Sequence, residues 1–123
     1  MEEKEIEIWR WIEDENYTHK ASTLGRIKSF IDDKENGVII EPEVYRKNDG
    51  NMISKHKLKN GSSERSGIRI SNTENFITMA FLGFKFVYPR MLVEHIDENP
   101  LNNRIENLRV IIHPDFRNYQ DED

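Results

Sequence analysis

The sequence contains no cysteine and no apolar run long enough to cross a membrane. The absence of cysteine excludes disulfides, thiolate zinc sites and cysteine nucleophiles, and it favours a reducing intracellular compartment. The acidic start "MEEKEIEIWRW" also lacks the apolar region of a secretion signal. We therefore expect a cytoplasmic protein without a membrane anchor, in which any metal site uses His, Asp, Glu or Asn.

The chain also lacks an excess of positive charge. Its 18 Lys and Arg residues are outnumbered by 23 Asp and Glu residues, which gives a formal net charge of −5. This balance argues against bulk electrostatic binding of nucleic acid, because phosphate binding relies on Lys and Arg that release counterions. The stretch 46–69 is nevertheless basic, so a local basic face remains open.

The first 70 residues indicate a small, irregular antiparallel sheet structure. Hydrophobic residues make up 36% and charged residues 33% of a 123-residue chain, which is enough for one compact domain or two very small ones. Short apolar or alternating segments are separated by turn residues. We expect a strand or extended piece in 6–12, two short strands around Gly25, and further strands in 52–59 and 67–70.

The rest of the chain predicts a helix, two strands and a second helix, which makes the fold α+β. Asn72 or Thr73 is a suitable N-cap, and apolar residues at helical spacing predict a helix from about Thr73 to Leu82. The segment 91–96 is typical of a short buried strand, and 107–112 of another. Pro114 favours the first turn of a final helix.

An amide-rich loop separates the last two predicted strands and brings His95 opposite Asn107. A histidine held beside an acid suits a general base that activates water. The neighbouring Glu94 offers a hard oxygen ligand to a divalent metal. The alternative for His95 alone is a partly buried histidine that a backbone carbonyl satisfies. Two further histidines belong to no motif: His19 and His56.

Two stretches resemble a known family. The segment 77–110, "ITMAFLGFKFVYPRMLVEHIDENPLNNRIENLRV", resembles the HNH endonucleases, in particular their homing-endonuclease branch. The segment 7–29, "EIWRWIEDENYTHKASTLGRIKS", is similar to the NUMOD4 module of that branch. The resemblance implies a NUMOD4-like β-rich module in 1–70 and an HNH ββα-metal (His-Me finger) unit in 71–123. It also implies a phage or mobile-element setting.

The resemblance assigns roles to residues at matching positions. His95 becomes the general base, and Asn107 the middle asparagine whose side chain bridges backbone groups across the loop. Asn102 and Asn103 match loop amides that satisfy backbone groups in a tight turn. One divalent metal, Mg²⁺ or Mn²⁺, is implied, with Glu94 as a ligand.

Two positions depart from the family pattern. Glu94 stands where the family often has Asp, which keeps the charge on a longer arm. Phe116 stands where the final helix usually provides an Asn or His ligand, and phenylalanine cannot bind a metal. His113 is the candidate substitute, since it lies three positions earlier on a similar helix face.

The front module offers candidate DNA contacts. Arg26 and Lys28 in "TLGRIKS" are placed to bind DNA phosphates, and the alternative is a solvated hairpin. Trp9, Trp11 and Tyr17 are expected to be core or packing residues rather than base-stacking platforms, because aromatic burial is what a small sheet most needs.

The sequence leaves three functions open. The first is a metal-dependent DNA endonuclease or nickase in which His95 activates water. The second is a catalytically degenerate HNH-derived protein that binds DNA or a protein partner without cutting, which Phe116 and the acidic charge favour. The third is a fold relic without a selected role. We expect no membrane partner.

Overall fold

The computed structural model describes residues 5–12, 18–59, 67–82 and 91–112. Its first sheet has four antiparallel strands in chain order. These strands are β1 (Trp9–Trp11), β2 (His19–Ser22), β3 (Ile27–Ser29) and β4 (Val38–Ile40). Gly25 lies in the turn between β2 and β3 with φ +86°, a conformation that favours glycine. The two strands expected around Gly25 are therefore confirmed.

The second sheet has three antiparallel strands, with β6 in the centre. They are β5 (Glu43–Arg46), β6 (Met52–Lys59) and β7 (Ile68–Asn72). Side chains along β6 alternate between the two faces of the sheet. Ser54, His56 and Leu58 are buried, while lysines occupy the positions between them and beyond. Two polar side chains therefore lie on the core-facing side of this strand.

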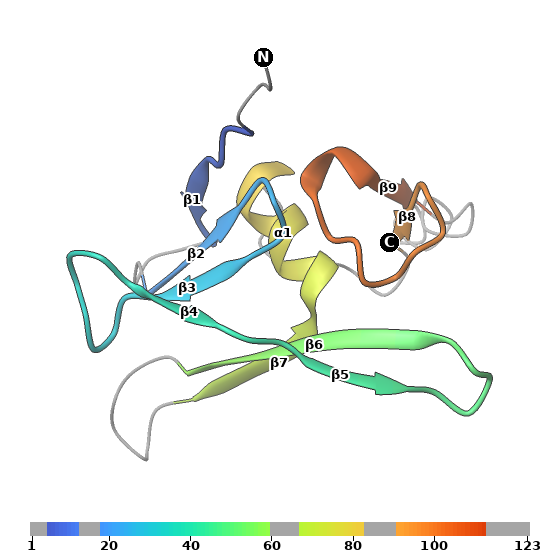
Figure 1. Ribbon diagram of the computed structural model, residues 1–123, viewed down its shortest axis with the longest axis horizontal. Coiled ribbons are helices and arrows are strands. Elements are labelled where there is room, and N and C mark those ends of the chain that lie inside the picture. The colour runs from blue at the N-terminus through green and yellow to red at the C-terminus, as the bar shows by residue number, and fades with distance from the viewer. Residues whose placement is uncertain (1–4, 13–17, 60–66, 83–90, 113–123) are drawn as a thin grey trace, which may run out of the picture.

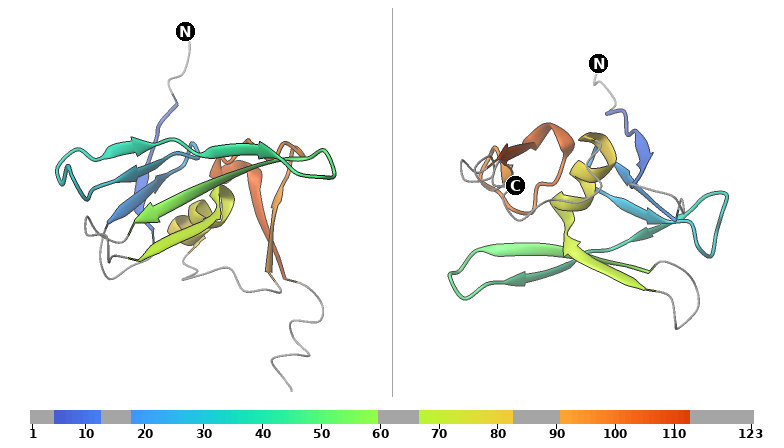
Figure 2. Two further views of the ribbon diagram at one scale, coloured as in Figure 1. Left: turned by 90° about the horizontal axis from the view of Figure 1, so that it is seen from below. Right: turned by 180° about the vertical axis from the view of Figure 1, so that it is seen from behind.

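Helix α1 (Thr73–Leu82) begins and ends at the predicted residues. Strand β8 (Met91–His95) pairs antiparallel with β9 (Leu108–Ile112), and a short 3₁₀ helix, η1 (Ile105–Asn107), precedes β9. The first sheet lies on one side of α1 and the β8–β9 hairpin on the other, with the second sheet along a third side (Figure 1). Figure 2 shows the same arrangement from two further directions. The described residues thus form a sheet-rich α+β arrangement around one helix.

One hydrophobic cluster joins these elements. Its buried members are Ile12, Ala21, Ile27, Leu58, Phe76, Ile77 and Leu108. Full burial of each large apolar side chain contributes about 1.5–3 kcal/mol. The cluster draws on all three sheets and on α1, so its members come from both sides of residue 70. The division into 1–70 and 71–123 stays a prediction.

The expected burial of one strand is wrong, and two tryptophans are less buried than core residues. Strand β8 was expected to be buried, but the Leu92 side chain is 55% exposed, because only one face of the two-stranded hairpin meets the core. Trp9 and Trp11 are only partly buried, since β1 is an edge strand. The Nζ atoms of Lys28 and Lys20 lie 4.2 and 4.5 Å from the centres of these two rings. The tryptophan rings therefore pack against cations, and the Trp11 ring also meets Phe30 edge-on.

Tyr17 and the helix expected from Pro114 lie outside the described residues. None of the helices in the described part of the chain combines the length and apolar character needed to span a membrane.

Candidate active site

His95 and Asn107 meet where the β8–β9 hairpin opens into its loop. His95 is the last residue of β8 and pairs with Leu108, the first of β9. The next backbone amide, that of Ile96, donates to the Asn107 carbonyl at 2.8 Å. The strand pairing thus closes the loop at its base. His95 thus ends its strand as expected, whereas Asn107 lies in η1, one position before the residue that pairs with His95.

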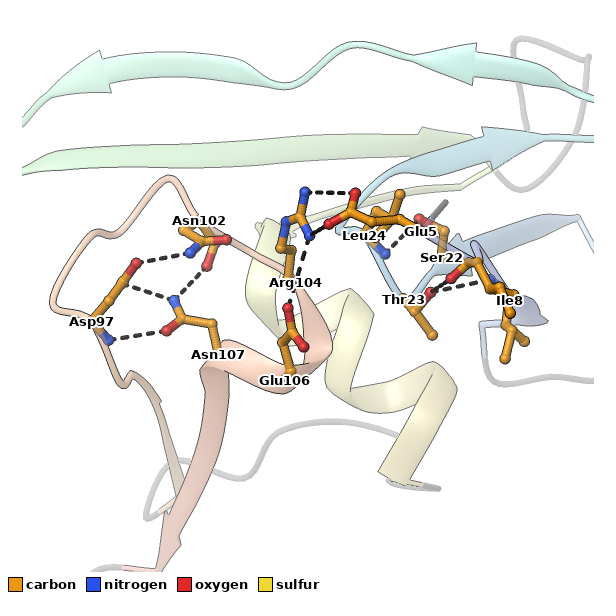
Figure 3. A network of polar contacts seen from close by, with 11 residues as sticks. Glu5, Ile8, Ser22, Thr23, Leu24, Asp97, Asn102, Arg104, Glu106 and Asn107 are labelled. Carbon is orange, nitrogen blue, oxygen red and sulfur yellow. Dashed lines mark hydrogen bonds and ion pairs between the residues drawn. The ribbon is translucent and has the colours of Figure 1, made fainter. Parts of the chain in front are cut away.

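Asn107 ties the two sides of this loop together (Figure 3). Its Oδ1 accepts from the Asp97 backbone N–H at 3.0 Å, and its Nδ2 donates to the Asn102 carbonyl at 2.9 Å. The same Nδ2 donates to Asp97 Oδ1 at 2.8 Å. The predicted bridging of backbone groups by Asn107 is therefore confirmed, while its part in catalysis stays a prediction.

Asp97 is a loop residue to which the sequence argument gave no role. Its Oδ2 accepts from Asn102 Nδ2 at 2.8 Å, and its Oδ1 accepts from the Asn99 backbone N–H at 2.8 Å. The hydrogen bond from Asn102, followed by those from Asn99 and Asn107, holds the pKa of the Asp97 carboxyl below its usual value. The spacing Asp97-x-Asn99 is itself a turn signal that could have identified it.

Asn103 differs from its expected role. Its side chain does not serve loop backbone groups: Oδ1 accepts from His95 Nε2 at 2.7 Å, and Nδ2 donates to Ser54 Oγ at 3.1 Å. The side chain is buried, and its partners lie on β8 and β6. Sequence separation concealed this contact, because Ser54 precedes Asn103 by 49 residues. Asn103 is therefore the residue that holds the His95 ring.

The turn at Gly25 supports Asn103 from the first sheet. The Thr23 carbonyl accepts from the Ile105 backbone N–H at 3.0 Å. A Cβ added at Gly25 would lie 2.8 Å from both the carbonyl carbon and the carbonyl oxygen of Asn103. Glycine is thus required there for close backbone approach as well as for its positive φ. The turn at Gly25 and the loop at Asn103, far apart in the sequence, therefore support His95 together.

His95 lines an open hollow of about 380 Å³. The acidic and basic side chains in its wall are Lys47, Glu74, Glu94, His95 and Glu98. Glu74, in the first turn of α1, is 8% exposed, and its Oε2 has no hydrogen-bond partner among the described residues. Burial raises the pKa of the Glu74 carboxyl. Sequence reasoning missed Glu74 because an acid in the first turn commonly stabilises a helix.

The predicted metal ligands are only partly described. Glu94 is half-exposed and lies directly opposite Arg109 in the hairpin register. Arg109 Nη2 donates to Glu94 Oε2 at 2.7 Å, so this carboxylate already has a cationic partner. His113 and Phe116 lie outside the described residues. Within residues 5–12, 18–59, 67–82 and 91–112, no group of three His, Asp or Glu side chains could hold a metal ion. These residues alone do not complete a metal site.

The two predicted DNA contacts already have partners within the protein. Arg26 Nε donates to Glu7 Oε2 at 2.7 Å, which makes an exposed ion pair. The Glu7 carboxylate raises the pKa of the Arg26 guanidinium. Lys28 lies over the Trp9 ring. Both cations are on β3 or in the turn before it, far in sequence from His95, and DNA contact by them stays a prediction.

Comparison with known proteins finds similarity to HNH endonucleases. Residues 79–114, under a third of the chain, match the model of the HNH endonuclease family. The structure is similar to that of the HNH homing endonuclease I-HmuI, solved in a study of DNA binding and cleavage by that enzyme, with a TM-score of 0.61 and 17% sequence identity. This match covers 94% of the present chain but 57% of the I-HmuI chain. No curated protein matches the chain.

These comparisons support the HNH family, and the structural match shows a shared fold. The NUMOD4-like resemblance of residues 7–29 stays a prediction.

Proposed function

We propose that the protein is an HNH-type DNA endonuclease or nickase in which His95 activates the attacking water. One observation carries this proposal: the His95 ring lines the hollow while Asn103 holds its Nε2 at 2.7 Å, within the segment that matches the HNH endonuclease model. The likeness to a homing endonuclease that binds and cleaves DNA supports DNA as the substrate.

The chemistry of the chain's own residues is hydrolysis of a phosphodiester. A neutral imidazole at residue 95 accepts a proton from water as the water oxygen bonds to phosphorus. The phosphorus–oxygen bond to one sugar oxygen breaks, and that oxygen takes up a proton from solvent water. Asn107, Asn102 and Asp97 keep the loop in one conformation, so the ring meets the phosphate in a fixed orientation. Asn107 thus acts in this proposal by positioning His95.

A divalent metal, Mg²⁺ or Mn²⁺, belongs to the same proposal. Three carboxyl groups and one lysine line the hollow, so a cation would supply positive charge that a DNA phosphate needs there. Glu94 and His113 are the proposed ligands, and Glu94 would have to exchange Arg109 for the ion. The described residues alone do not complete this metal site.

The nuclease proposal is tested by incubating supercoiled plasmid with the protein and Mg²⁺ or Mn²⁺. His95→Ala is expected to lower the nicking rate by about 10²–10⁴-fold, the usual contribution of a general base. The control is Lys34→Ala, a change in an exposed turn distant from the hairpin, which should leave nicking unchanged. Equal nicking by wild type and His95→Ala would reject His95 as the base.

A second candidate function is binding without cleavage. The Arg109–Glu94 ion pair favours it, because it occupies the carboxylate that a nuclease would offer to a metal. In that case the protein binds DNA, with Arg26 and Lys28 as phosphate contacts, or binds a protein partner. Fluorescence anisotropy with labelled duplex DNA at rising salt separates these cases, since only DNA binding through phosphates weakens steeply.

A further inference from the structure

A continuous line of hydrogen bonds, which we call the relay, runs from His95 through Asn103, Ser54, Thr73 and His56 into the interior of the protein. His95 Nε2 contacts Asn103 Oδ1 at 2.7 Å, and Asn103 Nδ2 contacts Ser54 Oγ at 3.1 Å. Ser54 Oγ donates to Thr73 Oγ1 at 2.8 Å. Thr73 Oγ1 in turn lies 2.8 Å from His56 Nδ1. The line ends where His56 Nε2 meets the Ile40 carbonyl at 3.0 Å.

The side chains between the two ends of this relay are shielded from water. Ser54, His56 and Thr73 are each no more than 3% exposed, and Asn103 is 7% exposed. Buried polar groups satisfy one another when water cannot do so, because an unmade hydrogen bond is costly there. Burial also lowers the pKa of His56, which favours its neutral imidazole. Each hydrogen in the relay therefore has a definite place.

The end of the relay at Ile40 fixes its direction. A backbone carbonyl only accepts, so His56 Nε2 must donate to it, and the neutral ring then accepts at Nδ1. The single hydroxyl hydrogen of Thr73 is thus donated to His56. Because Thr73 donates there, its oxygen is the acceptor for Ser54.

The same reasoning continues to His95. Ser54 gives its only hydroxyl hydrogen to Thr73, so it must accept from Asn103, and the amide nitrogen of Asn103 faces Ser54. The amide oxygen then faces His95, and an amide oxygen only accepts. His95 therefore carries its hydrogen on Nε2 when the ring is neutral. The count of donors and acceptors thus determines that Oδ1 of Asn103 faces His95 and Nδ2 faces Ser54. This orientation does not depend on which end atom was assigned as oxygen and which as nitrogen.

We propose that Ser54, Thr73 and His56 are positioning residues for His95, which fix its neutral tautomer through Asn103 and leave the Nδ1 lone pair to receive a proton. The tautomer follows from the relay alone, whereas the use of Nδ1 as a base rests on the proposed nuclease function. A fixed tautomer matters because an imidazole that presents N–H to the water cannot accept its proton.

The direct test is nitrogen NMR of the histidine rings at a pH where His95 is neutral, with its signals assigned by their loss in His95→Gln. In the wild type, Nε2 should be the protonated nitrogen of His95. Thr73→Val removes the link between Ser54 and His56 and should give a mixture of the two His95 tautomers. Thr73→Ser restores the hydroxyl and should restore the wild-type spectrum.

The matched control is Thr78→Val. Thr78 is a second fully buried threonine of α1, but its hydroxyl donates to the Asn75 carbonyl outside the relay. This variant should keep the His95 tautomer. Ser54→Ala, which interrupts the relay one link nearer to His95, should reproduce the effect of Thr73→Val.

Activity gives an independent measurement. If the nuclease proposal holds, Thr73→Val should lower the kcat of nicking by about ten- to a hundred-fold with little change in KM, the range known for groups that orient metal-binding histidines. A wild-type protein with its hydrogen on Nδ1, or an unchanged tautomer in both Thr73→Val and Ser54→Ala, would overturn the relay. Absence of nicking by wild type would reject the nuclease proposal while leaving the tautomer result intact.

Discussion

Replacing Gly25 with alanine tests whether the first sheet holds the loop that supports His95. Gly25 has φ +86°, and an added Cβ would lie 2.8 Å from two backbone atoms of Asn103 and 3.2 Å from the Arg104 nitrogen. Backbone atoms cannot turn away as a flexible side chain can. The alanine variant must therefore move the turn or the loop.

The cost has two parts. A left-handed conformation costs a residue other than glycine about 1–2 kcal/mol. The forced contact with Asn103 should add about 1–3 kcal/mol, as overpacking usually does. We therefore expect Gly25→Ala to lower the free energy of unfolding by about 2–5 kcal/mol in total.

Gly50→Ala is the matched control, because Gly50 has φ +90° but no atom within 4 Å of its added Cβ. It should lose only the conformational part, about 1–2 kcal/mol. Urea unfolding followed by tryptophan fluorescence measures both variants, and the difference between them isolates the contact with Asn103. Equal losses in the two variants would refute the claim that Gly25 positions this loop.

Two further changes test the polar groups around the site. Glu74→Gln should raise stability at neutral pH by about 1–2 kcal/mol, because it removes a buried acid with an unpartnered oxygen. Burial raises the pKa of the Glu74 carboxyl, so the folded state binds a proton there more tightly than the unfolded state does. The wild type should therefore lose stability relative to the variant as the pH rises above about 4.5. A gap between wild type and variant that stays constant from pH 4 to 8 would contradict this account. Asn107→Asp should lower the free energy of unfolding by about 2–4 kcal/mol. The variant loses both hydrogen bonds that Asn107 Nδ2 donates, and its new carboxylate faces the carboxylate of Asp97. Asn48→Asp, in an exposed turn, makes the same charge change and should lower the free energy of unfolding by less than about 0.5 kcal/mol in the same denaturation assay.

Local sequence patterns predicted the elements that depend on local interactions. Phe76, Ile77, Ala80 and Phe81 at helical spacing, with a polar N-terminus and Gly83 as the stop, were enough to place both ends of α1. Gly25 marked the β2–β3 turn, and the loop amides marked the turn between β8 and β9. In these cases neighbouring residues determine the conformation, so the sequence alone carried the information.

The relay could not be predicted in the same way, because its members come from distant parts of the chain. Asn103 meets Ser54 only after the hairpin has packed beside the second sheet. A signal was present in "MISKHKLK", where Ser54 and His56 share the face of Leu58 on an alternating strand. Polar residues on the core face of a strand must find buried partners, so this pattern indicates a polar network without identifying its other members.

The partial burial of the two tryptophans could not be predicted for a different reason. Aromatic residues generally seek the core, but β1 lies at the edge of its sheet, where Lys28 and Lys20 cover the rings instead. Sheet order is a long-range property, and periodicity within one strand does not reveal it.

The acidic residues at the front of the described chain affect how DNA binding would be measured. Glu5 bonds to Arg104, next to Asn103 in the loop, and Glu7 bonds to Arg26 (Figure 3 shows the first pair). A phosphate that uses either arginine must displace a carboxylate, so one anion replaces another and fewer small ions leave the surface. The salt dependence of affinity would then undercount the phosphates in contact. Glu5→Gln and Glu7→Gln would make the affinity for DNA fall more steeply with salt concentration. The two carboxylates are thus internal competitors of DNA.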